Sequence, residues 1–465
     1  MKSKVFLFLF VCVFTLFFSS SCNQTQTPVY QLEVNVADLE QALQDNLLKS
    51  WYPATIDTVY GGFLSDFTWD WQPSGPQNKM LVSQTRQVWT SSQAAMFLKD
   101  TAYTAIARHG LRNLVDTMWD GQYGGFYLLR DRQGEPVPDE RMDGYTGEKT
   151  AYSNAFAIYA LASYYELTHD PEALDYAKRT FQWLEEHSHD PENLGYVNRM
   201  TREGDWFGAK GMYKYTGRGI ARDYKDQNSS IHILEAFTEL YKVWPDPLLR
   251  ERLQEMLTLI RDTIITDRGY LTLFLELDWT PISFQDSTEA ARRANRGFDH
   301  VSFGHDVETA FLMLETEHVL GNHNNPVTLA IGKKMVDHAL AHGWDVKNGG
   351  FYYEGYYFNE NPDSCVILNN SKSWWVQAEG LNALLLMSKL FPDESQYYTS
   401  FEKQWQYIQT YLIDHQQGGW YGMGLDTRPK SRKAPKASDW KVNYHNYRAL
   451  MNCIKMLKNE SELSE

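Results

Sequence analysis

Three histidines stand in sequence surroundings that can support acid–base chemistry. His305 lies in the phrase SFGHDVE, His445 in the phrase WKVNYHNYR, and His232 directly after QNSSI. Imidazole takes up and releases protons near neutrality because its ordinary pKa is about 6.5. We therefore expect these three side chains to be candidates for a general acid or a general base.

Each histidine also has a purely structural interpretation. Glu308 follows His305 by three residues, so in a helix its carboxylate either orients the imidazole or only stabilises the helix terminus. His445 lies in an aromatic and polar cluster, whose many hydrogen-bonding side chains are unusual for packing alone, although packing stays an alternative. Ser229 or Ser230 is expected to cap the helix that begins near His232, which leaves the histidine itself without an assigned role.

Other kinds of chemistry find less support in the residue pattern. No pair of histidines at metal-ligand spacing has a third ligand close by in the sequence. His318 and His323 also have no such ligand nearby, so no catalytic metal is expected. A serine nucleophile of the Gly-x-Ser-x-Gly type is missing. A glycosidase stays open, because its two carboxylates need not be close in sequence.

A phrase of Asp, a few residues, Gly and an aromatic residue recurs along the chain at intervals of roughly 60 to 80 residues. The copies are Asp57 with Gly61, Gly62 and Phe63; Asp120 with Gly124, Gly125 and Phe126; Asp190 with Gly195 and Tyr196; Asp267 with Gly269 and Tyr270; Asp345 with Gly349, Gly350 and Phe351; and Asp414 with Gly418, Gly419 and Trp420. The interval leaves room for two helices and a loop in each unit.

The segments between the phrases have helical periodicity, as in residues 151–168 and 231–244. Asp170-Pro171 and Asp246-Pro247 are typical helix starts. Strand signals are weak apart from short stretches near the glycines. We therefore predict an all-α chain whose residues 36–460 form an (α/α)6 barrel, a toroid of six helical hairpins, rather than an open solenoid.

Composition narrows the range of partners. The formal net charge of -15 argues against binding a phosphate backbone, and the one basic run, residues 428–436, is expected to be a solvated loop. The chain has 15 Trp, 29 Tyr and 23 Phe, and such rings suit stacking on sugars as well as packing in a large core. A small saccharide is therefore a plausible ligand, and nucleic acid is not.

The N-terminus has the features of an export signal. Lys2 and Lys4 precede an apolar run over residues 5–18, and three serines lead to Cys22. We expect residues 1–22 to be a lipoprotein signal peptide, Cys22 to be lipidated, and residues 23–35 to be a polar tether. The expected location is the bacterial envelope, on the periplasmic side; the alternative is an ordinary signal peptide without lipidation.

Six phrases in order resemble the N-acylglucosamine 2-epimerase superfamily, and within it most closely the cellobiose or mannobiose 2-epimerases. They are QTRQVW, KTAYSNAFAIYAL, NSSIHILEAFTELYKVWPD, SFGHDVETAFLM, KSWWVQAEGL and DWKVNYHNYRA. The resemblance implies an (α/α)6 barrel, no cofactor and no metal. Phe311 stands where the disaccharide epimerases usually carry Trp, so stacking on a second sugar is expected to be weakened.

The resemblance also implies roles for single residues. His305 and His445 match the two acid/base histidines, His232 matches a histidine implicated in binding or ring opening, and Glu308 matches the glutamate beside the first. The residues matching substrate-binding positions are Arg86, Tyr152, Asn228, Trp374, Trp375, Glu379 and Trp440. The enzyme expected from this match is a carbohydrate 2-epimerase that inverts C2 through an enediolate.

Several alternatives remain open from the sequence. They are an N-acylglucosamine 2-epimerase, a mannose-type aldose–ketose isomerase, an (α/α)6 glycoside hydrolase, and a non-catalytic carbohydrate-binding lipoprotein. A pure binding protein does not need an acid/base pair, and a hydrolase would use carboxylates instead of histidines.

Overall fold

The computed structural model describes residues 34–138, 144–208, 223–323, 325–360, 362–461 and 463. Val34–Glu465 is one compact unit, and the other unit, Met1–Glu33, lies outside the described residues. The expected signal peptide, Cys22 and nearly all of the tether therefore also lie outside them and stay predictions. Within the described ranges no helix has the length and apolar character needed to cross a membrane.

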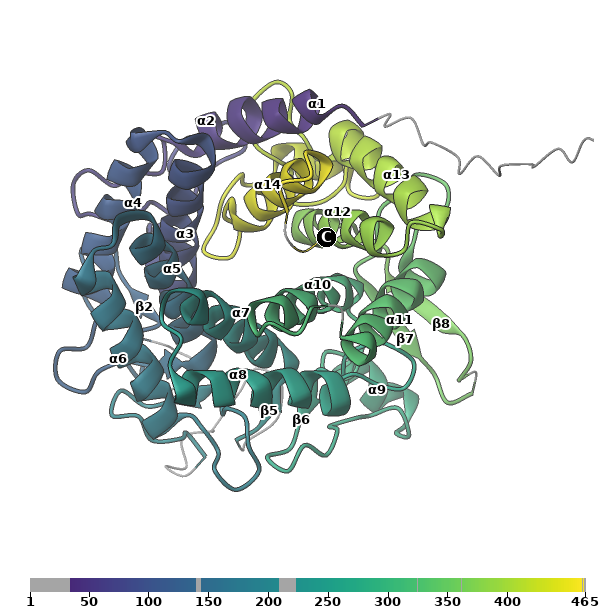
Figure 1. Cartoon of the computed structure of the whole chain (residues 1–465), viewed down its shortest axis with the longest axis horizontal. Coiled ribbons are helices and arrows are strands. Elements are labelled where there is room, and N and C mark those ends of the chain that lie inside the picture. The colour runs from purple at the N-terminus through teal and green to yellow at the C-terminus, as the bar shows by residue number, and fades with distance from the viewer. Residues whose placement is uncertain are drawn as a thin grey trace, which may run out of the picture. The chain divides into compact units, whose positions relative to one another are not determined.

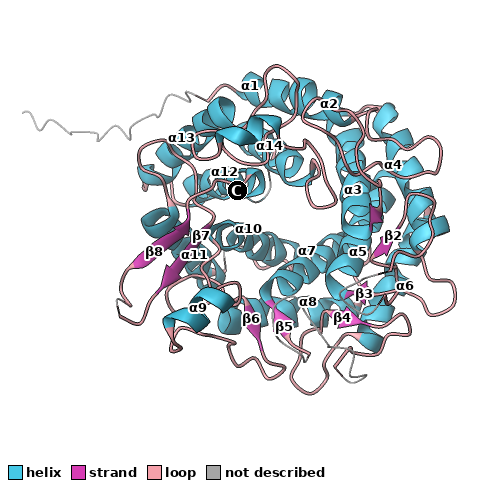
Figure 2. Cartoon of the chain, turned by 180° about the vertical axis from the view of Figure 1, so that it is seen from behind, coloured by secondary structure: helices cyan, strands magenta, loops and turns pink. Residues whose placement is uncertain are grey.

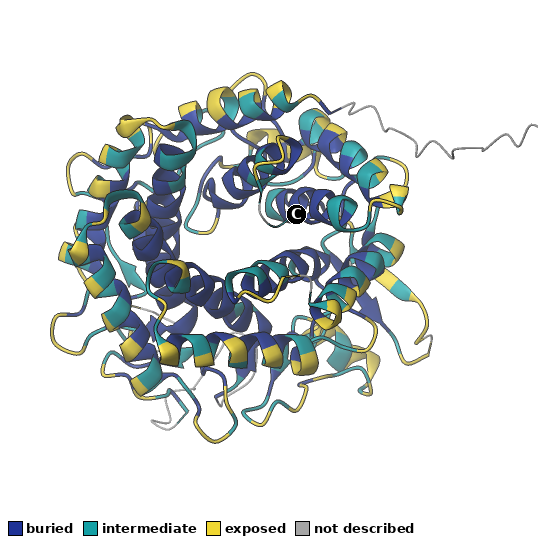
Figure 3. Ribbon diagram, viewed as in Figure 1, coloured by how far each residue is buried: buried dark blue, intermediate teal, exposed yellow. Residues whose placement is uncertain are grey.

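Six inner helices form a closed ring (Figure 1). They are α3 (Leu81–Leu98), α5 (Ala151–Thr168), α7 (Gln227–Val243), α10 (Phe303–Val319), α12 (Trp374–Leu390) and α14 (Tyr444–Leu457). Each packs against the next, and α14 packs against α3 to close the ring. They are buried nearly all round, which explains why α5 reads as apolar on every face (Figure 3).

Outer helices surround this ring, and each follows an inner helix in the chain (Figure 1). They are α4 (Thr101–Asn113), α6 (Pro171–His187), α8 (Pro247–Leu259), α11 (Pro326–Gly343) and α13 (Ser395–Tyr411). Asp170 and Asp246 cap α6 and α8 as expected, since their carboxylates accept the backbone N–H groups of Glu172 and Leu248. The predicted (α/α)6 barrel is confirmed.

The sixth hairpin is made from the two ends of the described chain. α14 packs against an N-terminal helical segment composed of α1 (Val36–Gln41), the π-helical η1 (Ala42–Leu48) and α2 (Lys49–Trp51). The backbone N–H of Gly419 donates to the Asn46 carbonyl at 2.9 Å, and the Asn46 amide donates to the Asp414 carbonyl at 3.1 Å. Ring closure therefore joins residues more than 360 positions apart in sequence.

The remaining elements are short (Figure 2). Antiparallel pairs are β1 (Lys79–Met80) with β2 (Leu129–Arg130), β3 (Lys149–Thr150) with β4 (Arg199–Met200), β5 (Lys225–Asp226) with β6 (Phe274–Leu275), and β7 (Glu354–Tyr357) with β8 (Cys365–Asn369). The other helices are η2 (Leu114–Met118), η4 (Ile260–Ile264), α9 (Glu289–Asn295) and η5 (Pro429–Lys433). The longer hairpin of β7 and β8 was not expected from the sequence.

The glycine phrases are the turns that lead from an outer helix to the next inner helix. An isolated β-bridge closes each turn: Ile56 with Phe63, Trp119 with Phe126, His189 with Tyr196, Ile265 with Leu271, Trp344 with Phe351, and Ile413 with Trp420. Gly125 has a φ of +68°, and a Cβ there would lie 2.8 Å from the Trp183 ring. Glycine is therefore required both by the backbone conformation and by the close approach.

Five buried lysines hold these turns to the inner helices that follow them. Each ammonium pairs with the aspartate of a glycine phrase: Lys79 with Asp57 at 3.7 Å, Lys149 with Asp120 at 3.0 Å, Lys225 with Asp190 at 2.9 Å, Lys372 with Asp345 at 2.7 Å, and Lys436 with Asp414 at 2.7 Å. The same ammonium groups also donate to carbonyl groups of the turns, as Lys225 does to Leu194 at 2.6 Å. A buried ion pair is tolerated when such hydrogen bonds satisfy it.

The structure corrects three details of the sequence interpretation. Asp267 is exposed and does not take part in a lysine pair, because Thr266 closes the fourth turn by hydrogen-bonding Tyr270. Lys436 is buried, so the basic run over residues 428–436 is only partly solvated. Asp226, not Ser229 or Ser230, caps α7, since its carboxylate accepts the Ser229 N–H at 2.8 Å.

Removing one of these lysines should be costly. Lys225→Met leaves the Asp190 carboxylate buried without its cation, and we expect a loss of about 3–5 kcal/mol in the free energy of unfolding. Chemical denaturation followed by circular dichroism measures this. Lys334→Met, at an exposed position, is the control and should change stability by less than about 0.5 kcal/mol. The double variant Lys225→Met with Asp190→Asn should recover part of the loss, and a single-variant cost below about 1 kcal/mol would contradict the role.

Candidate active site

The predicted acid/base residues come together at the N-terminal ends of the inner helices. His232 lies in the second turn of α7, His305 in the first turn of α10, and His445 in the first turn of α14. The strands and glycine turns precede these helices and therefore border the same end. The ring closure thus gathers three histidines that are separated by 73 and 140 positions in sequence.

The Trp375 ring lies against both acid/base candidates. Its centroid is 4.7 Å from that of His305 and 5.8 Å from that of His445. Ser302 Oγ lies 2.7 Å from Nδ1 of His305, which leaves Nε2 of that ring as the nitrogen free to meet a ligand. His305 and Trp375 are partly exposed, so a small molecule can reach them.

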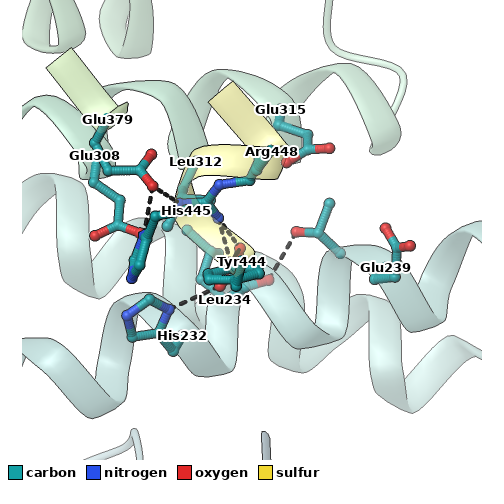
Figure 4. Close-up of polar contacts among 12 residues, drawn as sticks. His232, Leu234, Glu239, Glu308, Leu312, Glu315, Glu379, Tyr444, His445 and Arg448 are labelled. Carbon is teal, nitrogen blue, oxygen red and sulfur yellow. Dashed lines mark hydrogen bonds and ion pairs between the residues drawn. The ribbon is translucent and has the colours of Figure 1, made fainter. Parts of the chain in front are cut away.

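Arg448 links three buried carboxylates, of which Glu308 and Glu379 are labelled beside His445 in Figure 4. Its guanidinium donates to Glu308 at 2.5 Å and to Glu235, and it forms an ion pair with Glu379 at 2.7 Å. Glu379 Oε1 also lies 2.6 Å from Nδ1 of His445. Because this carboxylate accepts the proton of Nδ1, it holds Nε2 of His445 unprotonated and available as a base.

A second histidine–carboxylate pair uses the same arginine. Nδ1 of His232 lies 2.7 Å from Glu235, and Glu235 also accepts hydrogen bonds from Tyr444 and Arg448. The His232 ring contacts the Tyr152 ring at 5.3 Å between centroids. The two imidazoles of His232 and His445 are therefore oriented through one shared guanidinium.

Arg86 lies beside the histidines and carries a positive charge toward them. Its guanidinium stacks on Phe156 at 4.3 Å and Tyr444 at 4.9 Å and donates to the Tyr152 hydroxyl at 3.1 Å. The Asn228 side chain hydrogen-bonds the same hydroxyl. A rigidly stacked guanidinium of this kind suits an anionic ligand group.

Two further aromatic residues differ in their placement. The Trp440 ring is 56% exposed and lies 6.3 Å from the Tyr152 ring, at the edge of the cluster. Trp374 is partly buried, and the Lys441 ammonium lies 5.6 Å from its ring. Trp440 is therefore open to a ligand, whereas Trp374 lies against the loop that leads into α14.

The family of this chain follows from comparison with known proteins. The model of the N-acylglucosamine 2-epimerase (GlcNAc 2-epimerase) family matches residues 61–449. The chain belongs to this family. A cellobiose 2-epimerase of Bacteroides fragilis is 29% identical, and the match covers 91% of this chain and 99% of that protein. A D-mannose isomerase of Marinomonas mediterranea is 26% identical, with 88% and 94% covered.

A solved structure has the same barrel fold as this member of the N-acylglucosamine 2-epimerase family. The cellobiose 2-epimerase from Bacillus thermoamylovorans superposes with a TM-score of 0.77 at 27% identity, over 90% of this chain and 98% of that one. Members matched here are isomerases or epimerases of carbohydrates, and this chain is an enzyme of that class.

One expected side-chain contact is wrong. Glu308 does not orient His305, because Arg448 draws its carboxylate toward α14, 3.8 Å from Nδ1 of His445. Glu379 contacts His445 and Arg448, and its expected role in substrate binding stays a prediction. Both carboxylates are buried, and a buried carboxylate is stable only beside a cation or a strong donor.

Phe311 does not lie at the histidine cluster. It lines a cavity of about 650 Å³ together with Glu315, His318 and Lys455, which lie toward the C-terminal ends of α10 and α14. The histidines lie at the opposite ends of the same helices. The expected weakening of stacking on a second sugar by the exchange of Trp for Phe stays a prediction.

The sequence interpretation missed Arg448 and Glu235. Glu235 follows His232 by three residues, the same spacing as Glu308 after His305, and Arg448 follows His445 by three. Side chains three apart on a helix lie on one face, so the repeated spacing was a usable signal. The sequence gives no signal for the partner of each side chain, because the partners come from different helices.

The buried charges shift the protonation of the site. Burial, with His232, His300 and Arg86 nearby, lowers the pKa of His305 to about 3. Burial and the guanidinium groups of Arg86 and Arg448 lower the pKa of His445 well below its usual value. Although burial alone would raise it, Arg448 and His232 lower the pKa of Glu235 to about 2. The imidazoles of His305 and His445 are therefore neutral at neutral pH, as a base must be.

Glu308, Glu379 and His445 offer ligand atoms within 4.8 Å of one another, a spacing that resembles a metal site. The guanidinium of Arg448 already lies against both carboxylates and supplies the positive charge there. These residues are therefore better explained as an arginine-bound cluster than as metal ligands.

Glu379→Gln tests the orientation of His445. The amide has no negative charge to stabilise the Nδ1 proton, so we expect the isomerase kcat to fall by at least about 100-fold. Melting temperature and steady-state rates of both proteins provide the measurement. Glu251→Gln, on the exposed face of α8, is the control and should leave kcat unchanged. A kcat for Glu379→Gln within about threefold of the unmodified enzyme would refute this role.

Proposed function

We propose that this enzyme inverts C2 of the reducing-end aldose of a small saccharide, of the cellobiose or mannobiose type. The observation that carries the proposal is a pair of neutral imidazoles, His305 and His445, that both lie against the Trp375 ring. The similarity to cellobiose 2-epimerases over nearly the whole chain supports the choice of substrate.

Ring opening comes first in the proposed reaction. His232, held by Glu235, removes the proton of the O1 hydroxyl and delivers it to O5 as the C1–O5 bond breaks. The product is the open aldehyde, whose C2 proton is acidic because the electron pair left behind delocalises onto the C1 oxygen. Tyr152 and Trp440, beside His232, would hold the sugar ring during this step.

Proton transfer at C2 follows. One of the two imidazoles takes the C2 proton, and the electron pair forms an enediolate whose charge is balanced by the Arg86 guanidinium. The first imidazole is now an imidazolium. The negative enediolate raises the pKa of the second imidazole, which takes up a proton from water and donates it to C2, and the first imidazolium returns its proton to water. Return of a proton to the opposite face of C2 gives the epimer, and no atom other than hydrogen is exchanged.

Proton NMR in deuterated water tests this function. Cellobiose, mannobiose, N-acetylglucosamine and mannose are each incubated with the enzyme, with His305→Ala and with His445→Ala. We expect deuterium at C2 together with a new C2 epimer of a disaccharide. Both variants should lose at least about 100-fold in rate, because each removes one acid–base group.

The control and the other outcomes separate the alternatives. His415→Ala is the control. His415 is exposed and hydrogen-bonds the Gln409 carbonyl, so this variant should react like the unmodified enzyme. A ketose product would indicate an aldose–ketose isomerase, and reaction of N-acetylglucosamine alone would indicate the acylated sugar. The proposal fails if none of the sugars exchanges its C2 proton.

A further inference from the structure

The carboxylates around Arg448 outnumber the cations that contact them. Glu235, Glu308 and Glu379 are all buried, and the guanidinium of Arg448 forms an ion pair with each of them. If all three were ionised, with neutral imidazoles, the cluster would carry two uncompensated negative charges away from water. Like charges this close cannot all remain ionised in a buried site.

The hydrogen bonds show which carboxyl group is least stabilised as an anion. Glu235 accepts from Arg448, Tyr444 and the His232 ring. Glu379 contacts Arg448 at 2.7 Å and Nδ1 of His445 at 2.6 Å. Glu308 has one donor, Arg448, on Oε1 at 2.5 Å, whereas Oε1 of Glu379 has two contacts. The buried Oε2 atoms of Glu308 and Glu379 both have no hydrogen-bond partner among the described residues.

We propose that Glu308 carries a proton on Oε2 at neutral pH, and that this neutral carboxyl group keeps His445 unprotonated. An ionised Glu308, 3.8 Å from Nδ1 of His445, would add a second negative charge beside that imidazole and favour imidazolium. Glu308 is thus a positioning residue that acts through His445. The catalytic role of Glu308 depends on the proposed epimerisation, whereas the protonation of its carboxyl group does not depend on it.

The charged groups around Glu308 come from four neighbouring helices. They are Arg86 on α3, His232 and Glu235 on α7, Glu379 on α12, and His445 and Arg448 on α14. Burial, followed by the Glu379 carboxylate, raises the pKa of Glu308 to about 7 against the opposing effect of Arg448. Burial also raises the pKa of Glu379 to about 7, so the two groups compete for one proton. The smaller number of contacts on Oε1 of Glu308 assigns the proton to Glu308.

Infrared spectroscopy of the enzyme without sugar tests the assignment. The spectrum of Glu308→Gln is subtracted from that of the unmodified enzyme, with and without carboxyl-¹³C glutamate. We expect the carbonyl stretch of a protonated carboxylic acid in the difference, shifted by the label. Glu239→Gln, which alters another buried carboxyl group near the far ends of these helices, should leave that band in place. A difference that contains only carboxylate bands overturns the proposal.

Stability against pH gives a second readout that needs no activity. A carboxyl group whose pKa rises from 4.5 in the unfolded chain to about 7 in the folded one stabilises the fold at low pH. That contribution is lost as pH rises through the folded pKa. The unfolding free energy of the unmodified enzyme should therefore fall relative to Glu308→Gln over this window, and a constant difference contradicts the proposal.

Two further arrangements make these results decisive. If Glu308→Gln does not fold, Glu308→Met, which fills a similar volume without a charge, replaces it in both measurements. Neither measurement contains substrate. The protonation of Glu308 can therefore be established or refuted even if the enzyme epimerises none of the sugars.

Discussion

The guanidinium of Arg448 is the interaction on which both the barrel interior and the candidate site depend. It ties α14 to α7, α10 and α12 through three carboxylates that have been removed from water. Without it, each carboxylate would be a buried charge with no cation in hydrogen-bond contact, which a protein interior does not tolerate. The same bonds orient the carboxylates that hold His232 and His445, so the final helix of the ring positions part of the site simply by packing in place.

A different buried charge, repeated around the ring, positions the N-terminal ends of the inner helices. The lysine–aspartate pairs join each glycine turn to the inner helix that follows it in five of the turns, and in the fourth Thr266 closes the turn with a hydroxyl group. That fourth turn precedes α10, the helix that carries His305 and Glu308. The unit that departs from the repeat is therefore one that contributes acid–base candidates.

The neutral imidazoles suit the removal of a proton from carbon, which is the chemistry of carbohydrate isomerases and epimerases. Removing a proton from carbon requires a base that is not already protonated, and burial beside two guanidinium groups supplies that condition for His445. A glycoside hydrolase on the same fold would instead need two carboxylates facing the substrate. Here Glu235, Glu308 and Glu379 face Arg448 and the histidines, so their arrangement serves the imidazoles.

The sequence by itself determined the fold class, the helix periodicity, the positions of the glycine turns and the identity of His232, His305 and His445 as candidates. These follow from local patterns: spacing along a helix, residues that tolerate positive φ, and resemblance of ordered phrases. Only the tertiary structure decided that Glu379 contacts His445, that Glu308 faces Arg448 rather than His305, and that Phe311 lines the far cavity. The physical reason is that a buried charge is paired with whichever opposite charge ring closure brings near, and spacing within one helix does not specify a partner that another helix supplies.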